Sequence, residues 1–79
     1  MTNTQYRLVE IVAQYGPKSA YSLHKIADAT NVRDSRGNKL TDASVRSRCA
    51  ELRALNIFTE VGREPTGRGG HTAAVWGLK

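Results

Sequence analysis

Residues 41–63, TDASVRSRCAELRALNIFTEVGR, change from helical to strand periodicity within one uninterrupted run. The apolar residues of the first half recur every three or four positions, as the buried side of an amphipathic helix does. They are Val45, Cys49, Leu52 and Leu55. Thr41 or Asp42 suits the N-cap, and Asn56 suits the left-handed position after the last turn. The spacing predicts a helix over about 42–55.

The second half of this run has the period of a β-strand. The residues that alternate onto one side are Ile57, Thr59 and Val61. A stretch rich in glycine and proline follows, and residues 72–78 have the pattern of a second strand. We therefore expect a β-hairpin over about 57–78. Since an isolated hairpin is marginal in water, Trp76 and Leu78 are expected to anchor it on the helices.

A first helix is predicted upstream, over about 4–15. Thr2 and Gln5 have the spacing of a capping box, with Thr4 as an alternative cap, and Gly16 supplies a left-handed end. Its apolar side consists of Leu8, Ile11, Val12 and Tyr15.

A second helix is predicted over about 19–29, with Ser19 as its N-cap. Residues 31–40 follow and read NVRDSRGNKL, in which turn-forming residues alternate with basic ones. We interpret this segment as an exposed basic loop whose ends are anchored by Val32 and Leu40.

The charge of the chain indicates the class of partner. Its 79 residues include twelve Lys and Arg against seven Asp and Glu, which gives a net charge of +5. Eight of the twelve are arginine, whose planar guanidinium matches phosphates and guanine edges. This balance favours a nucleic acid as partner. The alternative is that the charge merely keeps a small domain in solution.

The cysteine count and the hydropathy pattern indicate the compartment. Cys49 is the single cysteine, so the chain cannot be a disulfide-stapled secreted domain. No apolar run approaches the ~20 residues that a membrane helix needs. We expect a cytoplasmic, nucleoid-associated protein.

The order of three helices followed by a hairpin resembles the winged helix-turn-helix family. The residues that carry the resemblance are LHKIADATNV at 23–32, the run at 41–63, and TGRGGHTAAVWGL at 66–78. The resemblance covers nearly the whole chain and is strongest to small bacterial and phage proteins. It implies an α+β fold, mainly α, with a single winged-helix domain over residues 1–79. It also implies that the third helix enters the major groove of DNA and that the hairpin is the wing.

One departure from the family concerns the segment between the second and third helices. This turn usually has three or four residues, whereas residues 31–40 number about ten. Either the third helix docks at an altered angle, or the loop is itself a contact element. Its basic residues favour the second interpretation.

The candidate DNA-binding residues lie on the third helix, the wing and this loop. Small residues early on the helix let the backbone approach the groove, and Arg46 can bind a guanine edge. Arginine on a glycine-rich wing can enter the minor groove or grip phosphates. The alternative is an ordinary solvated helix face and a flexible turn. The candidates are Arg36, Lys39, Asp42, Ala43, Ser44, Arg46, Ser47, Arg48, Arg63, Arg68 and His71.

Other chemistries find little support in the sequence. His24, His71 and Cys49 lack the spacing of metal ligands, and Cys49 fits a small core residue better than a redox sensor. No catalytic motif or phosphate-binding loop is present. We expect no enzyme activity, no cofactor and no metal.

The expected function is therefore sequence-dependent binding of double-stranded DNA by a small transcriptional regulator of a bacterium, phage or mobile element. It would bind singly, as a homodimer or with copies side by side. One alternative is a winged helix that binds a host protein, as an inhibitor or adaptor. Another is binding of single-stranded nucleic acid, which would need exposed aromatic side chains along a basic groove.

Overall fold

The computed structural model describes residues 1–66 and 69–79. Three helices and a three-stranded antiparallel sheet form this part of the chain, which confirms the α+β class. Each predicted helix, and the hairpin, ends within one residue of its expected limits. The helices are α1 (Asn3–Tyr15), α2 (Ala20–Ala29) and α3 (Asp42–Ala54), and the strands are β1 (Lys18–Ser19), β2 (Phe58–Pro65) and β3 (Thr72–Leu78).

The helix ends follow from side chains close to them in the sequence. Thr2 and Gln5 form the predicted capping box at α1: the Gln5 amide donates to Thr2 Oγ1 at 3.2 Å, and the Thr2 amide donates to Gln5 Oε1 at 2.8 Å. Gly16 ends this helix with a φ of +88°, which a residue with a Cβ rarely adopts. Thr41 caps α3 by accepting the Ser44 amide at 3.0 Å. Each of these ends was predicted and is confirmed.

One apolar core joins the three helices and the base of the hairpin. Its buried members are Leu8, Ile11, Val12, Leu23, Ala27, Leu40, Val45, Cys49, Leu52 and Phe58. Three residues expected in it, Tyr15, Leu55 and Leu78, are instead between 43% and 55% exposed. Tyr15 is the last residue of α1 and Leu55 follows the last residue of α3, so the chain turns away where each would reach the core. On the hairpin, Phe58 takes the buried place opposite Leu78.

The sheet contains a strand that the sequence did not reveal. Its order is β1-β3-β2, and Lys18 and Ser19 of β1 pair with Trp76 and Val75 of β3. A two-residue strand is too short to show a period of its own. Because α2 starts directly after β1, this pairing fixes the hairpin to the amino end of α2.

A β-bulge interrupts the pairing of β2 with β3. It lies between Glu60 and Gly62. The extra residue interrupts the alternation, and Val61 is left 53% exposed. Val61 nevertheless shares a side with Thr59, as expected, because a Cβ built at Gly77, the partner of Thr59 on β3, would lie 2.9 Å from Val61 Cγ1.

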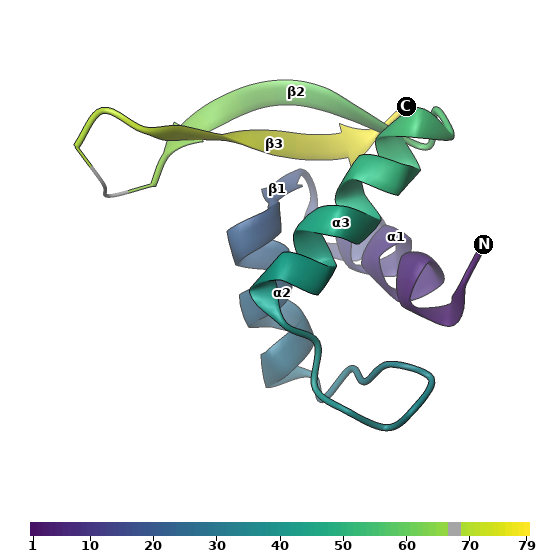
Figure 1. The fold of residues 1–79 in the computed structure, drawn as a ribbon. Coiled ribbons are helices and arrows are strands. Elements are labelled where there is room, and N and C mark those ends of the chain that lie inside the picture. The colour runs from purple at the N-terminus through teal and green to yellow at the C-terminus, as the bar shows by residue number, and fades with distance from the viewer. Residues whose placement is uncertain (67–68) are drawn as a thin grey trace.

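The segment at 31–40 is an ordered turn. Arg33 and Lys39 form an antiparallel bridge, and the Asp34 carboxylate accepts the amides of Arg36 and Asn38 at 2.9 Å each. Its ends are held as predicted, since Val32 is half-buried and Leu40 is buried. Figure 1 shows this loop beside the amino end of α3, whereas β2 and β3 run across the carboxyl end of that helix and extend past α2.

Candidate nucleic-acid interface

Helix α3 presents three different sides. Val45, Cys49 and Leu52 face the core and are buried. The opposite side is exposed and made of small residues, namely Ala43, Ser47, Ala50 and Ala54. Of the helix's arginines, Arg46 and Arg53 lie on the flank toward the hairpin, and Arg48 lies on the flank toward α1.

A groove runs between α3, the amino end of α2 and the hairpin, and encloses about 1560 Å³. We call it the α3–hairpin groove. It brings together four of the predicted site residues: Asp42, Arg46, Arg63 and His71. From α3, α2 and the end of β1 it is lined by Asp42, Arg46, Ala50, Arg53, Ala54, Ala20, Tyr21, Ser22 and Ser19. From the hairpin it is lined by Arg63, Glu64, Pro65, Thr66, His71, Thr72, Ala73, Ala74 and Trp76.

Arg46 stands in this groove one helical turn after Asp42. Its Nε lies 3.3 Å from Asp42 Oδ2, and the two side chains are 66% and 47% exposed. An exposed ion pair of this kind contributes only about 0.3–0.5 kcal/mol to folding. The guanidinium can therefore exchange its carboxylate partner for another anion at little cost.

A second arginine of the groove, Arg53, is not among the site residues predicted from the sequence. Its guanidinium carbon lies 5.9 Å from the ring centroid of Trp76 on β3, within the range of a cation–π contact. The seven-residue spacing between Arg46 and Arg53 is two helical turns, which places both on one flank. That spacing could have revealed Arg53, although its contact with Trp76 requires the folded hairpin.

The hairpin contributes Arg63 and His71 to the groove. Arg63 Nε donates to Thr72 Oγ1 at 2.9 Å across the two strands, and its Nη1 lies 3.1 Å from Glu60 Oε1. The His71 side chain is exposed, while its backbone carbonyl accepts the Thr66 amide at 3.1 Å. Both side chains stand on the hairpin wall opposite α3.

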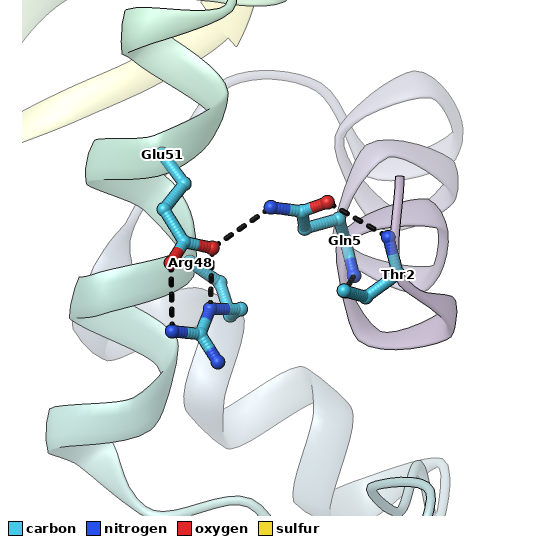
Figure 2. A network of polar contacts seen from close by, with 4 residues as sticks. All are labelled: Thr2, Gln5, Arg48 and Glu51. Atoms are coloured by element: carbon cyan, nitrogen blue, oxygen red, sulfur yellow. Dashed lines mark hydrogen bonds and ion pairs between the residues drawn. The ribbon is translucent and has the colours of Figure 1, made fainter.

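Arg48 lies outside the groove, in a polar network that joins α3 to α1 (Figure 2). Its Nε and Nη2 approach the two carboxylate oxygens of Glu51 at 2.7 and 2.8 Å. Glu51 Oε1 also accepts a hydrogen bond from Gln5 Nε2 at 2.8 Å. Because Gln5 is held by the capping box with Thr2, this network ties α3 to the amino end of α1 (Figure 2).

The remaining predicted site residues have separate positions. Ser44 is half-buried, four residues before Arg48 on the same flank. Arg36 and Lys39 lie on the 31–40 turn, where Lys39 Nζ is 3.6 Å from Asp28 Oδ1. None of residues 31–40, all of them described, lines the groove. Arg68 lies outside the described residues.

The geometry of the ionisable groups gives no support to metal or thiol chemistry. Burial raises the pKa of the Cys49 thiol to about 12, so the thiol stays protonated at neutral pH. Within residues 1–66 and 69–79, no three His, Cys, Asp or Glu side chains gather as metal ligands would. In the same residues, no helix combines the length and apolar character needed to cross a membrane.

Comparisons with protein-family models, with curated proteins and with solved structures found no match for this chain.

Proposed function

We propose that this chain is a small winged-helix protein that binds double-stranded DNA and regulates transcription in a bacterium, phage or mobile element. In this proposal α3 enters the major groove, and the hairpin of β2 and β3 acts as the wing. Regulation comes from occupying or bending a site, by one copy or by copies side by side.

The observation that carries the proposal is the cationic lining of the α3–hairpin groove. Arg46, Arg53 and Arg63 converge on it from two elements, against the carboxylates of Asp42 and Glu64. The guanidinium groups of Arg46 and Arg63 sit in exposed ion pairs. Such pairs are weak, so phosphate can replace the carboxylates.

The shape of α3 supports the same function. Its exposed side carries only short side chains at Ala43, Ser47, Ala50 and Ala54. A helix bearing short side chains can bring its backbone close to the floor of a major groove, which is wide enough to admit a helix. The arginines of the flank then stand beside the phosphates and base edges.

A second candidate is a protein-binding module, used as an inhibitor or adaptor. The apolar share of the groove lining favours it, since Ala20, Ala50, Ala54, Ala74 and Trp76 also face the groove. A protein partner would fill the groove mainly with apolar side chains. Its binding would then depend weakly on salt.

The test is a fluorescence-anisotropy titration of the protein against a labelled duplex of mixed sequence at several salt concentrations. Neutralising about 4–6 phosphates gives a log–log slope of roughly −4 to −5. Arg46→Ala should weaken binding by about 1–3 kcal/mol. Arg7→Ala is the matched control, because Arg7 also occupies an exposed ion pair, with Glu10 on α1.

Absence of binding at low salt would overturn the proposal. Binding that ignores the salt concentration would also overturn it, in favour of a protein partner. An equal effect of Arg7→Ala and Arg46→Ala would show that only the net charge matters and that the groove does not hold the DNA.

A further inference from the structure

Asp42 is an unexpected neighbour for a surface that binds phosphates. Its carboxylate lines the cationic α3–hairpin groove and stands 3.3 Å from Arg46 Nε. A carboxylate at this position repels the DNA backbone. In a protein–DNA interface such a carboxylate is favourable where it accepts a hydrogen bond from a donor of the DNA.

The fold holds the Asp42 side chain at a defined place. Asp42 is the first residue of α3, directly after the cap Thr41, where the helix dipole favours a negative charge. Arg46 follows one turn later, about 6 Å along the helix axis. Both side chains therefore start from the same flank of α3, one turn apart.

The geometry of the contact decides which donors remain available. Arg46 uses Nε toward Asp42 Oδ2, which leaves its two terminal nitrogens to donate elsewhere. Arg48 on the other flank differs, because its Nη2 donates to Glu51 Oε2 and its Nε lies 2.7 Å from Glu51 Oε1. Of these two arginines, Arg46 is the one poised to fork onto a pair of acceptors.

The major groove offers one base pair that matches both partners. Guanine presents O6 and N7 side by side as two acceptors, which suit the two terminal nitrogens of an arginine. Its partner cytosine presents the N4 amino group, a donor that suits a carboxylate. Thymine O4 and guanine O6 are acceptors, so a carboxylate disfavours thymine or guanine as the base that it faces.

We propose that Asp42 and Arg46 together are the specificity-determining pair of this protein, with Arg46 reading guanine and Asp42 reading the amino group of the cytosine paired with it. This inference rests on the proposed binding of duplex DNA through α3. It adds the base that the helix selects.

The test is selection of sequences from a duplex pool with a randomised centre, at a salt concentration that permits specific binding. The wild-type protein should enrich guanine opposite cytosine at one position. Asp42→Asn should reduce this preference by about tenfold. The Asn amide can donate as well as accept a hydrogen bond, so it also tolerates bases that present an acceptor. Arg46→Ala should abolish it, and Glu10→Gln, which opens an equivalent ion pair on α1, should leave it unchanged.

A second measurement uses the wild-type protein and a modified form of the selected duplex. Replacing the guanine by 7-deazaguanine removes the N7 acceptor and should weaken binding by about tenfold. Replacing it by hypoxanthine keeps both O6 and N7 and should leave binding unchanged. This measurement does not depend on how any variant folds.

The outcomes separate this inference from the proposed function. Salt-dependent duplex binding with the same base preference in wild type and Asp42→Asn overturns the inference and leaves DNA binding intact. An unchanged affinity for the duplex that carries 7-deazaguanine also overturns the inference and leaves DNA binding intact. Absence of binding to every duplex in the pool overturns both.

Discussion

The interface assigned to α3 depends on which side of the helix faces the core. The same substitution, Leu→Ala, made at two positions of the chain tests which side that is. Leu52 and Leu55 both continue the apolar spacing of the sequence. In the folded chain Leu52 is 0% exposed, whereas Leu55 is 55% exposed just after the last turn. We expect Leu52→Ala to be strongly destabilising and Leu55→Ala to have little effect.

The expected size of each effect follows from burial. Leu52→Ala removes buried carbon atoms and leaves a cavity, which costs about 3 kcal/mol within a usual range of about 2–5. In a domain of this length, each kcal/mol lowers Tm by about 4–8 °C, so the loss is roughly 12–24 °C. Leu55→Ala removes contacts of a side chain that is largely in water, and its effect should stay within about 0.5 kcal/mol.

Thermal unfolding followed by circular dichroism at 222 nm measures both changes under one condition. Ser47→Ala, on the exposed side, should leave Tm nearly unchanged and serves as the baseline. Equal losses for the two leucine variants would refute the facing of α3. A larger loss for Leu55→Ala would mean that the helix is rotated, and the assignment of Arg46 to the groove would fail with it.

Three further predictions concern the polar contacts and the buried thiol. Gln5→Ala should lower the free energy of unfolding by about 1–2 kcal/mol in urea titrations, because it removes both the capping bond that Gln5 Oε1 accepts from the Thr2 amide and the bond that Gln5 Nε2 donates to Glu51 of α3. The pKa of the Cys49 thiol is about 12 in the folded chain against an ordinary 9.0, so only the unfolded thiol ionises between these values. The wild type should therefore lose up to about 1.4 kcal/mol of stability per pH unit above pH 9 relative to Cys49→Ala, and parallel pH profiles would contradict the burial. In duplex titrations Arg48→Ala should reduce the affinity for DNA less than Arg46→Ala does, because Glu51 contacts the Arg48 guanidinium at two of its nitrogens. A larger loss for Arg48→Ala would mean that the DNA contacts the α1 flank of α3.

The candidate site was only partly predictable. Arg46, Asp42 and Arg63 were named from the sequence and line the groove, because helical spacing and hairpin position already put them outside the core. Arg53 was missed, since its role depends on Trp76, which lies 23 positions further along the chain. Arg48 was expected beside the DNA-facing residues, and the fold gives it Glu51 as a partner on the other flank.

The sequence by itself determined the helices, their ends and the existence of the hairpin. These features arise from interactions between residues a few positions apart: Thr2 with Gln5, Thr41 with Ser44, and the free backbone of Gly16. A local interaction leaves its signature in a local pattern of residues. The predicted limits were therefore accurate to one residue.

The tertiary structure decided how these elements meet. The pairing of Lys18 with Trp76, the bulge beside Val61 and the contact of Gln5 with Glu51 join residues whose partners are set by packing. The bulge inserts an extra residue into β2, which the alternating pattern of residues 57–61 does not reveal. The α3–hairpin groove arises in the same way, because it exists only once β1 has fixed the hairpin beside α2 and α3. Contacts between distant residues depend on the free energy of the whole packed core, and no periodicity along the chain records them.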